Sequence, residues 1–287
     1  MPILFRWLAR WPLWLLHLAG ALLGWLTYWA SPAYRRRFDA NVAQAGVAPV
    51  DARPAIAHAG RLLMELPFLW LRPAGEPIRP RLDWQGETLL TDALRRGKGI
   101  VLLTPHMGSF EVTAQACAQS FAAEFGPITV LFRPARKPWV RALMRGARER
   151  PGVATAPATL SGVRQMMRAL RRGEAVGLLP DQVPPDGMGV WTPFFGQPAY
   201  TMTLAARLVQ QTGATPLLIW GERLPQGAGF VVRVSELPEP LPRDDPTQAE
   251  SAAVINRAME QLIRQCPQQY LWGYHRYKAP RSGTPAA

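Results

Sequence analysis

The fold of this 287-residue chain is decided by the stretch Gly99-Ile100-Val101-Leu102-Leu103-Thr104-Pro105-His106-Met107-Gly108-Ser109-Phe110-Glu111. An apolar run bounded by glycine and proline predicts a buried strand over 100–104. The following Met-Gly-Ser segment indicates a tight turn, with Ser109 as the N-cap of a helix over 110–122. The stretch therefore predicts a strand-to-helix corner with a histidine at the end of the strand.

His106 and Glu111 can be interpreted in two ways. A carboxylate in the first turn of a helix can face a histidine across the corner, which is the pairing of a general base and the group that orients it. Glu111 would be kept ionised by the N–H groups of the helix N-terminus. The alternative is a histidine that only caps the turn and a glutamate that is an ordinary surface charge.

Outward from this corner, strand-like and helix-like runs alternate. The expected strands are 100–104, 128–132, 153–156, 175–179, 216–220 and 230–234. The expected helices are 110–122, 139–150, 162–171, 203–212 and 249–265. Such alternation predicts an α/β fold with a mostly parallel central sheet flanked by helices.

Polar residues follow three of these strands. His106 and Arg133 come after the first two, and Asp181-Gln182 come after the strand over 175–179. Ligands of parallel sheets bind at the carboxyl ends of the strands. We expect Arg133 to hold a phosphate or a developing oxyanion, and Asp181 to orient Arg133 or contact the substrate. Residues 183–199 are expected to form a long functional loop.

The helix expected over 139–150 carries Arg141, Arg145 and Arg148 on one face. This face is either a basic stripe for phosphates or lipid headgroups, or an ordinary solvated surface.

The N-terminal region contains an uncharged stretch from Trp11 to Ala30, flanked by arginines. Its length suits a membrane-spanning helix, and its tryptophans suit the membrane interface. The alternative is a helix on the membrane surface. We expect an anchor over 1–37 and a catalytic domain over 38–287. A buried or interfacial helix is expected over 54–71, with Glu65 either solvated or paired with Arg61.

Composition narrows the class of partner. The chain has 33 Lys and Arg against 20 Asp and Glu, a formal charge of +13, which favours nucleic acid, an anionic membrane or an acidic substrate. The motifs of nucleic-acid binding, of nucleotide-binding loops, of His-Glu-x-x-His metal sites and of Gly-x-Ser-x-Gly hydrolases are missing from the sequence. Two cysteines, Cys117 and Cys266, suit a reduced, cytosol-facing compartment.

Several motifs in order resemble one known family. They are His106-Met107-Gly108-Ser109-Phe110-Glu111, Phe132-Arg133-Pro134, Pro180-Asp181-Gln182, Pro193-Phe194-Phe195-Gly196 and Pro267-Gln268-Gln269-Tyr270-Leu271-Trp272, followed by Arg276 and Lys278. Together they resemble the bacterial late acyltransferases of lipid A biosynthesis, and the resemblance covers nearly the whole chain. Two positions depart from that pattern: Ser109 stands where the family often has Asn, and His275 is displaced by one residue.

The resemblance implies a fold like that of the glycerolipid acyltransferases. It implies transfer of a fatty acyl chain from acyl-carrier protein to a hydroxyl of a lipid A precursor, a late secondary acylation in lipopolysaccharide biosynthesis. His106 is then the base and Glu111 its orienter, while Arg133, Asp181 and Gln182 bind substrate. No metal or cofactor is implied beyond the carrier thioester. The implied location is the cytoplasmic side of the bacterial inner membrane, single-pass or peripheral.

Two other functions remain open from the residues. One is acylation of another envelope glycolipid or aminolipid, and the other is a non-catalytic membrane adaptor with a degenerate site. The joint presence of His106, Glu111, Arg133 and Asp181 favours an enzyme.

Overall fold

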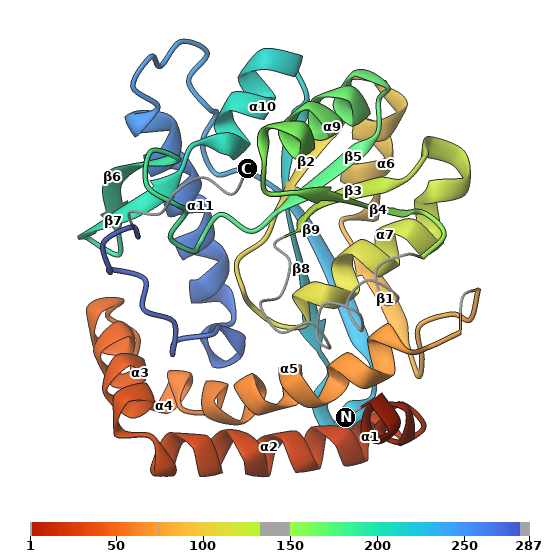
Figure 1. Ribbon diagram of the computed structural model, residues 1–287, viewed down its shortest axis with the longest axis vertical. Coiled ribbons are helices and arrows are strands. Elements are labelled where there is room, and N and C mark those ends of the chain that lie inside the picture. Colours follow the sequence, from red (N-terminus) through yellow and green to blue (C-terminus); the bar gives the residue numbers. More distant parts are fainter. Residues whose placement is uncertain (1, 74, 133–149, 282–287) are drawn as a thin grey trace.

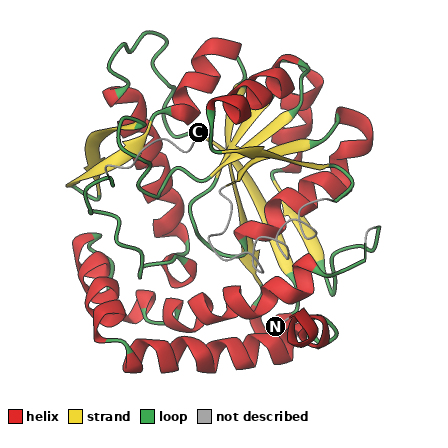
Figure 2. Ribbon diagram, viewed as in Figure 1, coloured by secondary structure: helices red, strands yellow, loops and turns green. Residues whose placement is uncertain are grey.

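A computed structural model describes residues 2–73, 75–132 and 150–281 of the chain. Within those residues, seven strands form a central sheet in the order β1-β9-β8-β2-β5-β3-β4 (Figures 1 and 2). Their bounds are β1 Leu82–Gln85, β2 Ile100–Leu103, β3 Ile128–Phe132, β4 Val153–Pro157, β5 Ala175–Leu178, β8 Thr215–Arg223 and β9 Phe230–Glu236. Only β8 and β9 pair antiparallel among these neighbours. The mostly parallel α/β fold predicted from the sequence is confirmed.

Strand β2 lies at the centre of the sheet, and all four of its residues are buried. Successive side chains of a strand point to opposite faces. Accordingly, Val101 and Leu103 belong to one hydrophobic cluster and Ile100 and Leu102 to another. A strand covered on both faces needs a continuous apolar run, which is why this stretch identified the fold.

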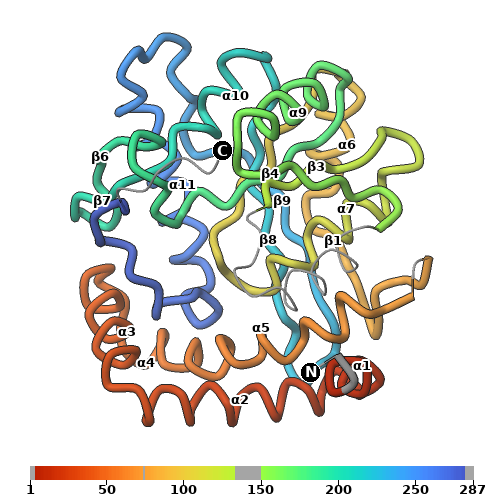
Figure 3. The backbone as a smooth tube through the Cα atoms, in the orientation of Figure 1, coloured from red at the N-terminus to blue at the C-terminus, as the bar shows by residue number. Residues whose placement is uncertain are grey.

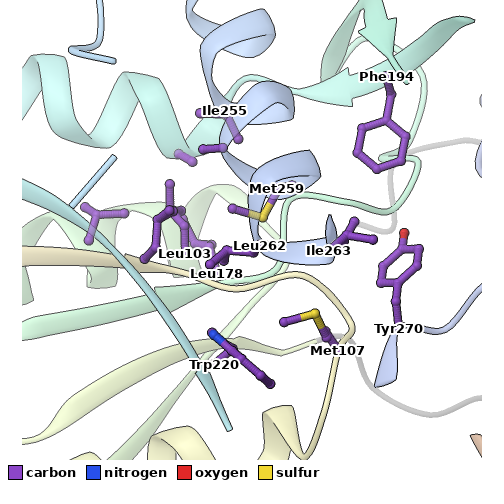
Figure 4. Close-up of a cluster of buried hydrophobic side chains, with 14 of the residues drawn as sticks. Leu103, Met107, Leu178, Phe194, Trp220, Ile255, Met259, Leu262, Ile263 and Tyr270 are labelled. Carbon is purple, nitrogen blue, oxygen red and sulfur yellow. The ribbon is translucent and has the colours of Figure 1, made fainter. Parts of the chain in front are cut away.

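Helices cover both faces of the sheet (Figure 2). One face packs against α9 (Leu160–Arg171), α10 (Leu204–Thr212) and α11 (Ala249–Gln265), and the other against α6 (Glu87–Arg95) and α7 (Phe110–Phe125). Figure 4 shows the first of these cores, where Leu103, Leu178 and Trp220 of the sheet meet Met259 and Leu262 of α11.

The N-terminal region forms a helical layer beneath this sandwich: α1 (Pro2–Leu8), α2 (Leu13–Ala30), α3 (Pro32–Gln44), α4 (Pro49–Ala52) and α5 (Ala55–Trp70). Helix α2 runs alongside α5 and across the base of the domain (Figures 1 and 3). By length and composition α2 alone, among the helices that the structure describes, could cross a membrane. The division into an anchor over 1–37 and a catalytic domain over 38–287 stays a prediction.

Some elements differ from those expected. The region expected as a loop over 183–199 contains a hairpin of β6 (Gly189–Phe194) and β7 (Gln197–Met202). Its turn is Phe195-Gly196, and both residues have positive φ, the geometry of a two-residue hairpin turn. Strand β1 and helices α3 and α6 were not predicted. The helix expected over 139–150 and its arginine face lie outside the described residues.

Candidate active site

The predicted site lies at the carboxyl edge of the sheet, where β2 and β5 are parallel neighbours. Leu103, the last residue of β2, is paired with Leu178, the last residue of β5. His106 and Asp181 each come three residues after that pair. The register of two adjacent strands therefore brings a histidine and a carboxylate together that are far apart in the sequence.

The two side chains make direct contact. His106 Nδ1 lies 2.6 Å from Asp181 Oδ1. The backbone N–H of His106 donates to Asp181 Oδ2 at 2.9 Å. A proton on Nδ1 directed at the carboxylate leaves Nε2 as a hydrogen-bond acceptor, which is the tautomer required of a general base. The side chain of Asp181 is 1% exposed and that of His106 is 18% exposed, so the imidazole alone reaches the surface.

Neighbouring groups keep Asp181 ionised. Burial raises the pKa of this carboxyl, but the charge and the hydrogen bonds of His106, together with the charge of Arg276, outweigh burial and lower the pKa below its usual value. Tyr270 lies beside the same carboxylate. Burial, and then the charge of Asp181, raise the pKa of the Tyr270 phenol well above its usual value. The site thus holds a carboxylate and a neutral phenol at physiological pH.

The C-terminal segment after α11 forms a wall of this site. The N–H of Leu271 donates to the carbonyl of His106 at 3.1 Å, and the N–H of Gly108 donates to the carbonyl of Gln269 at 2.9 Å. Further on, Arg276 donates to the carbonyl of Tyr200 at 2.7 Å and so joins the segment to the β6–β7 hairpin. The aromatic and basic run near the C-terminus was part of the family resemblance, but its contact with the corner after β2 was not predicted.

A second buried network holds the corner from below. Arg223, at the end of β8, donates to the Gly108 carbonyl at 2.5 Å. It also donates to both oxygens of Glu65 at 2.7 and 2.9 Å. Glu65 contacts His17 of α2 at 3.2 Å. Glu65 is completely buried, so the expectation that it is solvated or paired with Arg61 was wrong: the apolar face of α5 packs over the end of β8, and Arg223 supplies the opposite charge.

The other predicted site residues lie as follows. Glu111 stands in the first turn of α7, and its Oε2 accepts a hydrogen bond from Trp70 Nε1 at 3.1 Å. Asp181 occupies the position at His106 Nδ1 that the sequence had assigned to Glu111. Gln182 is half-buried beside Asp181, and Arg133 lies outside the described residues. The roles of Glu111, Gln182 and Arg133 stay predictions.

Ser109 begins α7, as expected, but its hydroxyl does not cap the helix. The hydroxyl is buried, and it makes no hydrogen bond with any residue that the structure describes. The backbone N–H of Ser109 instead donates to the carbonyl of Gly221 in β8 at 2.7 Å. Gly108 has a φ of +55°, and a Cβ at this position would overlap the Gly221 carbonyl. The close approach of the corner to β8 therefore requires glycine.

The sequence is similar to those of known proteins. A model of the family described as bacterial lipid A biosynthesis acyltransferase matches residues 7–279. The chain is 27% identical to the lipid A biosynthesis lauroyltransferase of Escherichia coli K12 over 79% of this chain and 71% of that protein. It is 24% identical to the palmitoleoyltransferase of the same strain, over 76% of this chain and 68% of that protein. It is also 24% identical to the lipid A biosynthesis myristoyltransferase of that strain, over 69% of this chain and 59% of that protein.

The family match covers helix α2, the His106 corner, the end of β5 with Asp181 and the C-terminal wall together. The pairing of a partly exposed histidine with a buried, ionised carboxylate is the chemistry that activation of a hydroxyl requires. On this combined evidence, the chain is an acyltransferase and belongs to the bacterial lipid A biosynthesis acyltransferase family.

Proposed function

We propose that this protein transfers a fatty acyl chain from acyl-carrier protein to a hydroxyl of a lipid A precursor, as a late secondary acylation. The observation that carries the proposal is the contact of 2.6 Å between His106 Nδ1 and Asp181 Oδ1 at the carboxyl edge of the sheet. An alcohol is a poor nucleophile at neutral pH, and a positioned base removes that obstacle. The carrier-protein donor and the lipid A acceptor are inferred from the family resemblance.

The proposed reaction uses the free nitrogen of His106. Nε2 accepts the proton of the acceptor hydroxyl while the hydroxyl oxygen attacks the thioester carbonyl, so that a carbon–oxygen bond forms and an oxyanion develops. Collapse of this tetrahedral intermediate breaks the carbon–sulfur bond, and the proton passes from the imidazolium to the departing thiolate. Asp181 stabilises the imidazolium throughout. Arg133 is proposed to bind the oxyanion or an acceptor phosphate, with Gln182 beside the acceptor, and no metal or cofactor takes part.

Charge and compartment support the proposed partners. A formal charge of +13 suits both an acidic carrier protein and a phosphorylated lipid. Cys117 and Cys266 are buried free thiols, and burial raises the pKa of each to about 12, so both stay protonated. These properties suit a domain on the cytoplasmic side of the inner membrane. Nucleic acid is not a proposed partner.

The proposal is tested with purified protein, an acyl-carrier thioester and a lipid A precursor. Mass spectrometry should show a product heavier by one acyl chain, and the product should disappear with His106→Ala. His275→Ala is the matched control, because His275 is an exposed histidine that has no role in the proposed reaction. In a deletion strain, an unchanged lipid A acyl count together with the loss of another acylated glycolipid or aminolipid would show that this other lipid, and not lipid A, is the acceptor.

A further inference from the structure

Helix α2 is fixed to the domain along its length. Its backbone touches that of α5, because a Cβ added at Gly60 would overlap the carbonyl oxygen of Gly20, and one added at Gly24 would overlap that of Ile56. Such contact between glycine-lined helices gives close packing. In the N-terminal half of α2, His17 is tied through Glu65 to the sheet.

Both ends of α2 also rest on the domain. At its start, the backbone of Trp14 contacts Gly227 in the β8–β9 connection. At its other end, α3 follows directly, and Asn41 Nδ2 donates to the carbonyls of Trp272 and Tyr274 at 2.6 and 2.8 Å. Helix α2 therefore lies across the base of the domain from one side to the other (Figures 1 and 3).

The opposite face of α2 is apolar and uncovered. Its large residues recur every three or four positions and are more than half exposed: Trp14, Leu18, Leu22, Leu26 and Trp29. Leu4 and Trp7 of α1 add to this set. We call these seven residues the α1–α2 face. An exposed set of this size exceeds the scattered apolar residues of an ordinary protein surface and marks an interaction site.

The charges around the α1–α2 face are mainly positive, and the first acidic residue of the chain, Asp39, accepts a hydrogen bond from Tyr28 of α2 at 2.8 Å. Residues 1–37 contain Arg6, Arg10 and the run Arg35–Arg37, all exposed, and no Asp or Glu. A groove of about 860 Å³ lies on the α2 part of the face, lined by leucines, tryptophans and Arg53. The Arg53 guanidinium lies 5.5 Å from the Trp25 ring centroid, at the rim of this groove. Apolar residues with arginines at both ends complement acidic headgroups over a hydrocarbon layer.

A membrane-spanning orientation of α2 conflicts with its packing. The 18 residues of α2 would extend about 27 Å, close to the thickness of a hydrocarbon core. Because α5 is in backbone contact with α2, it would enter the bilayer too, with Arg61, Glu65 and the strand end that holds Arg223. Charged groups at that depth are costly. An orientation in the membrane plane leaves all of these groups within the protein.

We infer, on the basis of the proposed membrane-bound function, that the α1–α2 face docks flat on an anionic phospholipid bilayer and that α2 lies in the interface instead of spanning it. The leucines and tryptophans insert by about 5–10 Å, the depth of an interfacial helix. Helix α5 then forms the next layer, and the His106 corner lies above α5, joined to it through Glu65 and Arg223. In this orientation, a lipid acceptor reaches the site from the bilayer surface.

The orientation is tested by labelling. Ala9→Cys and Ala30→Cys place a thiol beyond the start and at the end of α2. Each full-length variant is added to preformed phosphatidylglycerol vesicles and treated with an impermeant maleimide. The wild-type protein is the control, because it measures any labelling of the two buried cysteines. We expect both positions to be labelled in intact vesicles. Labelling of one position only until the vesicles are opened would establish a spanning helix and overturn the inference.

The face itself is tested by vesicle flotation. Leu22→Asp with Leu26→Asp should lower binding to phosphatidylglycerol vesicles by at least tenfold, and binding of the wild type should weaken in neutral phosphatidylcholine vesicles. Leu160→Asp is the matched control, because Leu160 is an exposed leucine of α9 at the opposite end of the molecule (Figure 1). Unchanged flotation of the double variant, or a stable dimer that hides the face from vesicles, would overturn the inference.

The two proposals fail separately. The double variant should keep wild-type acyl transfer to a detergent-dispersed acceptor, whereas His106→Ala should keep wild-type flotation and lose transfer. Normal flotation without any transfer by the wild-type protein would refute the proposed function and leave the docking surface standing.

Discussion

Two histidine–carboxylate pairs occur in the part of the chain that the structure describes, and their surroundings give them different chemical properties. His106 contacts Asp181 at 2.6 Å, and His17 contacts Glu65 at 3.2 Å. The His17–Glu65 pair is shielded from solvent, with side chains 6% and 0% exposed, and Arg223 binds both oxygens of Glu65. The His106–Asp181 pair keeps its imidazole partly exposed, and within residues 2–73, 75–132 and 150–281 no guanidinium binds the Asp181 oxygens.

The difference shows that residue types alone do not define a catalytic pair. A base must reach its substrate and must have a nitrogen free to accept a proton. His106 meets both conditions because it extends beyond the carboxyl end of β2. His17 points from α2 into the protein, where its partner already neutralises Arg223. We therefore expect changes to the His106–Asp181 pair to alter catalysis most, and changes to the His17–Glu65 pair to alter stability most.

The largest effect should follow from His106→Ala. Loss of a general base lowers the rate by about 10²–10⁴-fold. The free energy of unfolding should fall as well, because the buried Asp181 carboxylate loses its partner at Oδ1. Acyl transfer by the purified variant and urea unfolding of the same sample measure both quantities. Wild-type transfer by this variant would remove His106 from the mechanism.

Glu65→Gln should have the largest effect on stability. The substitution keeps the shape of the side chain but leaves Arg223 buried without an opposite charge, which typically costs about 3–5 kcal/mol of unfolding free energy. The matched control is Glu239→Gln, which breaks an exposed pair with Arg257 and should change the free energy of unfolding little, because solvent screens exposed pairs. Equal losses in the two variants would show that the buried network does not hold the corner.

Asp181→Asn should reduce acyl transfer less than His106→Ala does. The amide preserves the shape of the carboxylate but cannot stabilise an imidazolium, so we expect a loss of about 10²-fold, the lower end of the range for general base catalysis. The loss should appear in kcat with KM unchanged, because Asp181 acts through His106. A raised KM with normal kcat would instead indicate that Asp181 binds substrate, as the sequence had suggested.

Much of this arrangement could be predicted from the sequence, because its signals are local. The apolar runs between glycines and prolines identified the parallel strands of the central sheet. The positions directly after two of those strands identified His106 and Asp181 as site candidates. Strand β1 has three half-buried residues, one exposed residue and no clear alternation, so it offered no comparable signal.

The pairing of His106 could not be predicted, because it depends on the order of strands in the sheet. Glu111 is five residues from His106 and Asp181 is 75 residues away, so a local pattern favours Glu111 as the partner. The register of β2 with β5 places Asp181, and not Glu111, beside His106 Nδ1. Likewise, the hydrophobic pattern of α5 could not show that Arg223 would come to Glu65 from the end of β8.

The smallest effect should be the dependence of stability on pH, which compares the two pairs directly. The pKa of Asp181 and that of Glu65 are lowered in the folded protein: burial raises each, but His106 outweighs it at Asp181, and Arg223 and His17 outweigh it at Glu65. In the unfolded chain these groups have pKa values of about 3.9 and about 4.3.

Each carboxylate therefore contributes stability that is fully present above its unfolded pKa and is lost as the pH falls through its lowered folded pKa. Urea unfolding from about pH 7 to about pH 3 should show a falling free energy of unfolding for the wild type below about pH 4. Asp181→Asn and Glu65→Gln should each flatten that decline, since each removes one of the two titrating groups. A decline as steep as that of the wild type in both variants would show that other carboxylates control acid unfolding.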